Sequence, residues 1–253
     1  MNHTSDILLI DGDIVGYKVA SACEEAVHWG NDLWTLHADE REARNQVDLW
    51  IETILMELRA TKAVVYLSDK QNFRAGFFPE YKAQRKSKRK PMVLNALRDH
   101  MTKEWDAVTT FNMEADDLLG IDSTQDREDK ATIVSIDKDF RSIPGFLYNP
   151  DKPEDGIVEI TEEEANDWHL YQTLVGDASD NYKGCPSVGP KKAEQILEKG
   201  ETYVDKWDAV CNAFDKAGLS SKHALTQARV ARILRNEDYD NDTGAIKLWN
   251  PPK

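Results

Sequence analysis

The sequence predicts an α/β fold built on a doubly wound, mainly parallel sheet. Three short apolar runs rich in β-branched residues, 7–10, 63–67 and 132–136, have the length and composition of buried strands. Between the first two, residues 39–59 repeat their apolar side chains at steps of three and four, which is typical of one helix face. A second helix is expected after Asp116. Strands that alternate with helices favour parallel pairing, because parallel neighbours need a long crossover connection.

The C-terminal part has a different pattern, because it is mostly helical from about residue 162. A turn rich in Gly and Pro covers 184–190, and another helix is expected to follow it. Residues 150–158 are expected to form a loop or hairpin that joins the two parts. We therefore divide the chain into an α/β part, 1–160, and a helical part, 161–253.

Composition limits the class of protein. The 253 residues are 40% hydrophobic, which is enough for a large core and argues against disorder. No apolar run approaches the roughly 20 residues of a bilayer-spanning helix, and the N-terminus lacks the pattern of a secretory signal. The three cysteines are far apart in sequence, which suits a reducing compartment. We expect a cytoplasmic protein that does not contact a membrane.

The chain is strongly acidic, with 46 Asp and Glu residues against 32 Lys and Arg residues and a net charge of −14. Such a protein is not expected to coat nucleic acid nonspecifically, because it would repel the phosphates. Any contact with nucleic acid therefore needs a local basic patch. The excess acid, in turn, should be concentrated at a site that uses it.

Aspartates follow each of the three predicted strands. Asp11 ends the first, Asp69 comes just after the second, and Asp137 and Asp139 come after the third. Because the carboxyl ends of parallel strands meet at one edge of a sheet, these side chains should converge there. Asp also starts turns and caps helices, which would explain any one of them alone. Three such coincidences favour a metal site.

Two further acidic groups extend this set. All-oxygen ligands without His or Cys suit Mg²⁺ or Mn²⁺, and two cations would offset the repulsion among so many carboxylates. The macrodipole of the second helix also explains acids in its first turn, so spacing alone does not decide which of them bind metal. The additional candidates are Glu114, Asp116, Asp117, Asp177 and Asp180.

The basic residues are concentrated in 82–103, where eight Lys and Arg residues accompany one acid. Aromatic residues precede this segment, and aromatics beside cations suit a nucleic-acid strand, whose bases stack while its phosphates find charge. A solvated basic helix is the simpler explanation of a charge run. The contrast with the acidic remainder of the chain favours strand binding. The residues concerned are Arg74, Tyr81, Lys82, Arg85, Lys86, Lys88, Arg89 and Lys90.

The turn before the helix near Lys191 is a third candidate site. A glycine-containing turn that enters a helix can hold a phosphate on its backbone N–H groups. A plain connection between two helices is the alternative. The residues that would contact DNA here are Gly184, Ser187, Gly189, Lys191 and Lys192.

Five motifs, taken in order along nearly the whole chain, resemble those of the flap-endonuclease-like (PIN/FEN-like) 5′-nuclease superfamily. They are IDG at 10–12, PEYKAQR at 79–85, MEADD at 113–117, IDKD at 136–139 and GDASDN at 176–181. The narrower likeness is to the 5′→3′ double-strand DNA exonucleases of T-odd short-tailed bacteriophages. That likeness adds DWHL at 167–170 and QARVARILR at 227–235.

The resemblance implies a helical arch, at about 70–105, over a site that binds two metal ions, and a C-terminal helix–three-turn–helix element that grips duplex DNA, often with K⁺. Asp11, Asp69, Glu114 and Asp116 would bind one ion. Asp137, Asp139, Asp177 and Asp180 would bind the other, with Asp117 as their neighbour. Lys82 and Arg85 would contact the scissile phosphate, and Tyr81 would stack on a base.

We therefore expect a metal-dependent 5′→3′ exonuclease that degrades duplex DNA from its 5′ ends, in phage DNA replication or in degradation of host DNA. A structure-specific 5′-flap endonuclease, which would also remove RNA primers, shares the same catalytic residues and is the main alternative. A non-catalytic module that binds DNA structures is a third hypothesis, and the full set of acids argues against it.

Overall fold

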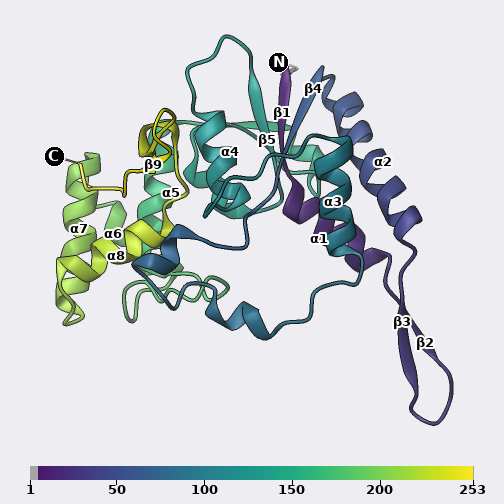
Figure 1. The fold of residues 1–253 in the computed structure, drawn as a ribbon. Coiled ribbons are helices and arrows are strands. Elements are labelled where there is room, and N and C mark those ends of the chain that lie inside the picture. The colour runs from purple at the N-terminus through teal and green to yellow at the C-terminus, as the bar shows by residue number, and fades with distance from the viewer. Residues whose placement is uncertain (1–4, 253) are drawn as a thin grey trace.

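The computed structural model describes residues 5–252, with the side chain of Lys86 left out. Its centre is a five-stranded sheet in the order β4-β1-β5-β6-β7, with helices on both faces (Figure 1). The strands are β1 (Ile7–Asp11), β4 (Lys62–Tyr66), β5 (Ala131–Val134), β6 (Gly145–Tyr148) and β7 (Ile157–Ile160). All neighbouring pairs are parallel except β6 with β7. The expected doubly wound, mainly parallel sheet is confirmed.

The strands β1 and β5 are buried on both faces, which is why they read as continuous apolar runs rather than as alternating patterns. Leu8 and Ile10 of β1 belong to one core, and Leu9 belongs to the core on the opposite face. The helices α1 (Gly12–Ala22), α2 (Glu40–Leu58) and α3 (Leu94–Glu104) cover the first face, and α4 (Ala115–Ser123) covers the second. The helices expected at 39–59 and after Asp116 are thus confirmed as α2 and α4.

The sharp passage from β1 to α1 places Asp11 at the carboxyl edge of the sheet. The Asp11 side chain caps α1 by accepting a hydrogen bond from the Ile14 N–H at 3.1 Å. Gly12 follows because a Cβ there would stand 2.8 Å from the Tyr66 carbonyl oxygen and 2.7 Å from the Val65 side chain. Any larger residue would push β1 and β4 apart.

The C-terminal region is helical, as expected. It contains α5 (Glu162–Val175), α6 (Pro190–Leu197), α7 (Tyr203–Lys216) and α8 (Ser221–Ala231), which share a core of their own. Residues 150–156 form the loop of the β6–β7 hairpin, which agrees with the predicted hairpin. Residues Ile233 and Leu234 leave this region and pack under α4 in the second core of the sheet. The division at residue 160 therefore stays a prediction.

The last described residues form a short 3₁₀-helix and a small antiparallel pair of strands. These elements are η5 (Asn236–Asp238), β8 (Tyr239–Asp240) and β9 (Ala245–Ile246). Tyr239 and Ile246 pack against the second core. No helix formed by residues 5–252 is long and apolar enough to cross a membrane.

The segment expected to be a helical arch, about 70–105, has its one α-helix, α3, at its end. Between β4 and α3 it contains only two short 3₁₀-helices, η1 (Phe73–Gly76) and η2 (Ala83–Ser87). It crosses the lower part of Figure 1, from α8 to the side of the sheet that carries α1 and α3. The α-helix α3 packs its buried face on the sheet core instead of standing over the site. We call residues 70–93 the crossing segment.

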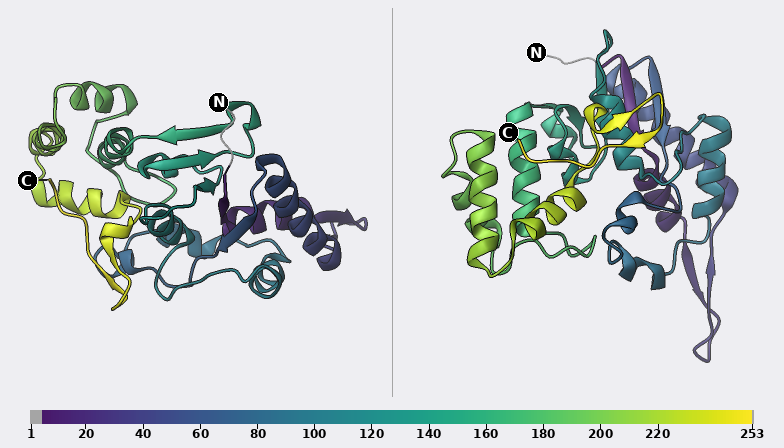
Figure 2. Two further views of the ribbon diagram at one scale, coloured as in Figure 1. Left: turned by 90° about the horizontal axis from the view of Figure 1, so that it is seen from above. Right: turned by 60° about the vertical axis from the view of Figure 1, so that its left-hand side comes forward.

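A hairpin that the sequence analysis missed projects from the α1 side of the molecule. It consists of β2 (Glu25–His28) and β3 (Trp34–His37), which pair only with each other. Figures 1 and 2 show it extending away from the body. The side chains of Trp29 and Trp34 are 62% and 60% exposed.

Candidate active site

Acidic side chains gather at the carboxyl edge of the sheet, as the strand-end pattern predicts. Asp11 ends β1, Asp137 follows β5, and Asp116 lies in the first turn of α4. The end of β4 positions α4, because the Ser68 hydroxyl accepts a hydrogen bond from the Ala115 N–H at 2.9 Å. With four more carboxylates this group forms what we call the acid row. Its members are Asp11, Glu114, Asp116, Asp137, Asp139, Asp177 and Asp180.

Burial and mutual repulsion perturb the acid row. Burial, together with the negative charges of Asp13 and Asp137, raises the pKa of Asp11 to about 7. Burial and the charges of Asp11 and Glu114 raise the pKa of Asp116 well above its ordinary value. Carboxylates in this environment favour either protonation or a neighbouring cation.

The other end of the row has the same character. Burial, Asp137 and Asp177 raise the pKa of Asp139 to about 7. One oxygen of Asp139, Oδ1, is buried and has no hydrogen-bond partner among the described residues. An all-carboxylate donor set with an orphaned buried oxygen fits a hard divalent cation.

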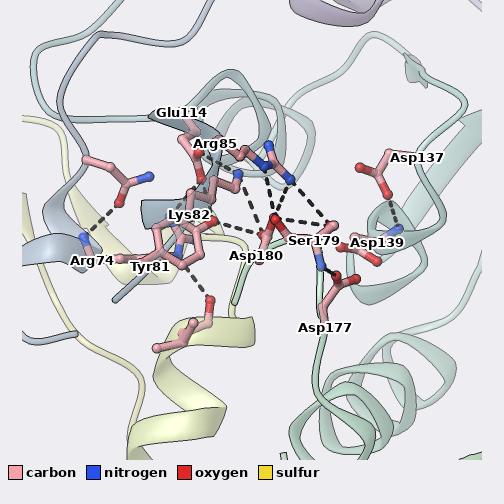
Figure 3. Close-up of polar contacts among 12 residues, drawn as sticks. Arg74, Tyr81, Lys82, Arg85, Glu114, Asp137, Asp139, Asp177, Ser179 and Asp180 are labelled. Atoms are coloured by element: carbon pink, nitrogen blue, oxygen red, sulfur yellow. Dashed lines mark hydrogen bonds and ion pairs between the residues drawn. The ribbon is translucent and has the colours of Figure 1, made fainter. Parts of the chain in front are cut away.

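In this structure, side chains of the crossing segment hold part of the acid row (Figure 3). Lys82 Nζ lies 2.6 Å from Glu114 Oε1 and 3.6 Å from Asp180 Oδ2. Arg85 Nη2 lies 2.6 Å from Asp180 Oδ1. Within residues 5–252, no three His, Cys, Asp or Glu side chains stand close enough together to enclose a metal ion.

Lys82 and Arg85 occupy the places the sequence analysis expected, beside the acids. Burial raises the pKa of Glu114, but the positive charges of Lys82 and Arg74 outweigh burial and hold this pKa below its usual value. Conversely, burial disfavours the Lys82 cation, but Glu114 and Asp180 raise the Lys82 pKa overall. The side chain of Lys82 is 18% exposed and that of Arg85 is 47% exposed, so both are open to a ligand.

Two of the predicted assignments are wrong. Arg74 was expected to bind DNA and Asp117 to bind metal, but they form a buried ion pair with two bonds of 2.7 Å. Their side chains are 3% and 0% exposed. Neither a phosphate nor a metal ion can reach groups that are enclosed and already satisfied in this way.

Tyr81 does not offer a ring face for base stacking. It is 9% exposed and packs with Tyr182, Val230 and Ala231. Its hydroxyl donates to Glu114 at 2.7 Å and also lies 3.1 Å from Asp180 Oδ2. The expected stacking role is therefore wrong for this arrangement, and Tyr81 instead orients two carboxylates.

Asp69, which follows β4, is held by backbone groups of its own loop and of Asn112. Its carboxylate accepts a hydrogen bond from the Asn112 N–H at 2.8 Å, and backbone N–H groups of Asn112, Lys70 and Gln71 lower its pKa. Its expected role as a metal ligand with Asp11, Glu114 and Asp116 stays a prediction.

The turn before α6 is divided between buried and exposed groups. Gly184 is buried, has φ of +62° and donates its N–H to Gln227 at 2.8 Å, so the expected phosphate contact at Gly184 is wrong. Ser187, Gly189, Lys191 and Lys192 are exposed, as a DNA contact requires. Lys192 donates to the Ser187 carbonyl oxygen at 3.2 Å.

The basic run beyond Arg85 lies on the surface. Lys88, Arg89 and Lys90 are exposed, while the Lys86 side chain lies outside the described residues. Arg89 differs from its neighbours because it makes a two-bond ion pair with Glu24 at the base of the hairpin, at 2.6 and 2.7 Å. Arg89 therefore fixes the crossing segment to the connection between α1 and the hairpin, as well as adding positive charge.

The sequence analysis missed two serines that organise the acids. Ser135 donates to Asp11 at 3.0 Å and accepts from the Asp137 N–H at 3.1 Å. Ser179 gives its N–H to Asp177 at 2.6 Å, and its carbonyl oxygen accepts from Arg85. The available signal was their place beside the acids, since Ser135 immediately precedes the 136–139 motif and Ser179 lies within the 176–181 motif.

The perturbed acids predict an unusual pH dependence of stability. Asp11 has an ordinary pKa of 3.8 and a folded pKa of about 7, so between these values the folded state binds more protons than the unfolded chain. The free energy of unfolding of the metal-free protein should therefore fall as pH rises through this window, by up to roughly 4 kcal/mol from Asp11. Urea denaturation in EDTA at several pH values measures it.

Asp11→Asn is the matched control, because asparagine still caps α1 but does not titrate. The variant should lose less stability between pH 4 and pH 7 than the native protein. An equal or steeper loss in the variant would contradict the pKa shift of Asp11.

Comparison with known proteins places the chain among DNA-degrading enzymes. A model of the 5′-3′ exonuclease N-terminal resolvase-like domain matches residues 6–145. An exodeoxyribonuclease of Enterobacteria phage T3 is 30% identical, with 97% of this chain and 93% of that protein covered. An exonuclease of Escherichia phage T7 is 29% identical over the same shares. A bacteriophage T5 flap endonuclease, solved with DNA and metal ions, has the same fold, with a TM-score of 0.62 and 14% identity over 89% of this chain and 88% of that chain.

Proposed function

The chain belongs to the 5′-3′ exonuclease family, and from this premise we propose that it hydrolyses duplex DNA from its 5′ ends in a reaction that needs divalent metal ions. The observation that carries the proposal is the acid row at the carboxyl edge of a parallel sheet, faced by Lys82 and Arg85. A row of carboxylates repels a negatively charged phosphodiester unless cations lie between the two.

Two ions, Mg²⁺ or Mn²⁺, would bind one at each end of the acid row, and they would draw its carboxylates closer together than they stand in this structure. Asp11, Glu114 and Asp116 would hold one, and Asp137, Asp139, Asp177 and Asp180 would hold the other. Asp69 would join the first group only if its side chain left the Asn112 N–H. When bound, such ions supply positive charge to the phosphate oxygens and lower the pKa of the attacking water.

Lys82 and Arg85 would bind the scissile phosphate of the substrate. Their present partners, Glu114 and Asp180, are also proposed metal ligands, so both cationic side chains would be free to turn to a phosphate if those carboxylates held metal ions instead. Each then donates hydrogen bonds to the nonbridging oxygens, where negative charge grows during hydrolysis. Tyr81 continues to hold the carboxylates of Glu114 and Asp180 in place.

Two surfaces would hold the DNA on either side of the acid row. Exposed Lys88 and Lys90 would attract the 5′ strand. The exposed turn residues Ser187, Gly189, Lys191 and Lys192 would contact duplex phosphates, with a K⁺ ion bound at the turn.

A structure-specific flap endonuclease is the second candidate. The T5 relative of the same fold is a flap endonuclease, and its reaction would use the same acids and cations. A related outcome is removal of RNA from an RNA–DNA hybrid. The third hypothesis, a non-catalytic binding module, does not explain why the pKa values of Asp11 and Asp139 are raised to about 7 by buried charge.

The deciding experiment digests a 5′-labelled blunt duplex and a 5′-flap duplex side by side with Mg²⁺. Short products released progressively from the duplex end would support the exonuclease, and a single cut at the flap junction would support the alternative. An RNA–DNA hybrid in a third reaction measures tolerance of RNA. Failure to cut any of the three would contradict the proposed function.

Binding should separate from cleavage when Ca²⁺ replaces Mg²⁺. Ca²⁺ accepts looser geometry at longer ligand distances, so the protein should bind 5′-ended DNA without cutting it. The affinity should fall as salt rises, with a slope set by the number of phosphates contacted. Fluorescence anisotropy at several salt concentrations measures this, and an affinity independent of salt would contradict the electrostatic clamp.

A further inference from the structure

We propose that the buried Arg74–Asp117 pair is a positioning device that sets where Glu114 and Asp116 stand in the acid row. This inference deepens the proposed function and rests on it. The pair joins three parts of the chain that are far apart in sequence. They are the start of the crossing segment, the first turn of α4, and the stretch 230–234 at the end of α8 and just beyond it.

The guanidinium of Arg74 is buried and is held by hydrogen bonds to several groups. Beyond the two bonds to Asp117, its Nε donates to the Val230 carbonyl oxygen at 3.1 Å and its Nη2 donates to the carbonyl oxygen of Arg232. Asp117 Oδ1 also accepts from the Leu234 N–H at 3.1 Å. The planar, two-bond geometry therefore fixes the rotation of α4 about its axis.

That rotation decides where the neighbouring acids point. Asp116 is adjacent to Asp117 on α4 and faces Asp11 and Asp137, so turning the helix would swing it out of the row. Glu114 precedes the helix, and Arg74 Nη1 lies 3.6 Å from Glu114 Oε2. The Arg74 guanidinium also lies 5.5 Å from the ring of Tyr81, whose hydroxyl binds Glu114.

A purely stabilising ion pair would have a different signature. Lys206 of α7 provides the comparison, because it is also buried and pairs with Asp167 at 2.6 Å and Glu163 at 3.6 Å, which belong neither to α4 nor to 230–234. Loss of either pair should make the protein easier to unfold. Only loss of the Arg74 pair should alter metal binding and the rate at the acid row.

The test compares Arg74→Lys and Asp117→Asn with the control Lys206→Met, all as the full chain below the unfolding temperature of each variant. Calorimetry with Mn²⁺ should show an affinity at least about tenfold lower in the first two variants, as is usual when the support of a metal ligand is lost. Their single-turnover rate at saturating DNA and Mn²⁺ should fall roughly 100-fold, as for a reacting group displaced by about 1 Å. The control should keep the native affinity and rate.

Native Mn²⁺ affinity and rate in both Arg74→Lys and Asp117→Asn would overturn the inference, as would equal losses in Lys206→Met. The calorimetry does not depend on cleavage. A native protein that binds Mn²⁺ but cuts no DNA would contradict the proposed function and still leave the positioning role measurable.

Discussion

Asp116→Asn is expected to abolish DNA cleavage and, at the same time, to stabilise the metal-free protein. Cleavage is lost because asparagine removes a negative ligand from the centre of the acid row. Stability rises because burial and the charge of Asp11 raise the pKa of Asp116, which means that the folded state disfavours its ionised form. The loss of rate should exceed the roughly 100- to 1000-fold that follows removal of one electrostatic stabiliser.

Single-turnover cleavage at saturating DNA and Mg²⁺ measures the first effect, and thermal denaturation in EDTA measures the second. Asp137→Asn should lose cleavage in the same way. Its local structure should be kept, because the asparagine side chain can still accept the hydrogen bond from the Asp139 N–H. Asp122→Asn is the matched control, because Asp122 lies at the other end of α4 and binds Tyr66 and Arg127 instead of the acid row. Near-native turnover in both Asp116→Asn and Asp137→Asn would refute the proposed metal site.

Lys82→Ala is expected to lower the saturated single-turnover rate by roughly 100- to 1000-fold while changing DNA affinity much less. Lys82 reaches the acid row and faces the proposed position of the scissile phosphate. Lys88 and Lys90 are exposed and lie further along the crossing segment, so they should act through attraction of the strand. Lys88→Ala with Lys90→Ala should therefore weaken binding and leave the saturated rate nearly unchanged.

Cleavage measured against enzyme concentration separates the two effects. Arg89 is kept in the double variant, because its ion pair with Glu24 makes any replacement a structural change as well as an electrostatic one. If the double variant lost saturated rate while Lys82→Ala lost only affinity, the division between catalytic and attractive cations would be reversed.

The sequence was sufficient to place Asp11, Asp137 and Asp139 at one edge of the sheet. Continuous β-branched runs mark strands that are buried on both faces, and parallel strands bring their carboxyl ends together. The composition of a strand and the residue at its carboxyl end are properties of a short segment. They can therefore be identified without knowledge of the tertiary contacts.

Arg74 shows what could not be read in this way. Its acidic partner lies 43 residues away, and the carbonyl groups that accept its other bonds lie more than 150 residues away. An arginine beside aromatic residues looks the same in sequence whether it stacks on a base or is buried in a core. Tyr81 was misassigned for the same reason, because its neighbours Tyr182 and Val230 come from the C-terminal region.

The missed hairpin has a different cause. Neither face of β2 or β3 is buried against the body, so the strands carry no run of core residues to mark them. The turn consists of Gly30, Asn31 and Asp32, which are residue types common in turns, and all three have positive φ in the structure. Without an apolar pattern on either side, that turn was indistinguishable from an ordinary loop.

The projecting hairpin also gives the protein an optical property. Two of its seven tryptophans, Trp29 and Trp34, stand in water, whereas Trp207 and Trp249 are each 7% exposed. A soluble quencher such as acrylamide will reach the first two indoles and leave the buried ones emitting. The difference spectrum is then dominated by the hairpin, because Trp50, Trp105 and Trp168 are only partly exposed. Whatever approaches this part of the molecule can therefore be followed by intrinsic fluorescence, with no dye attached.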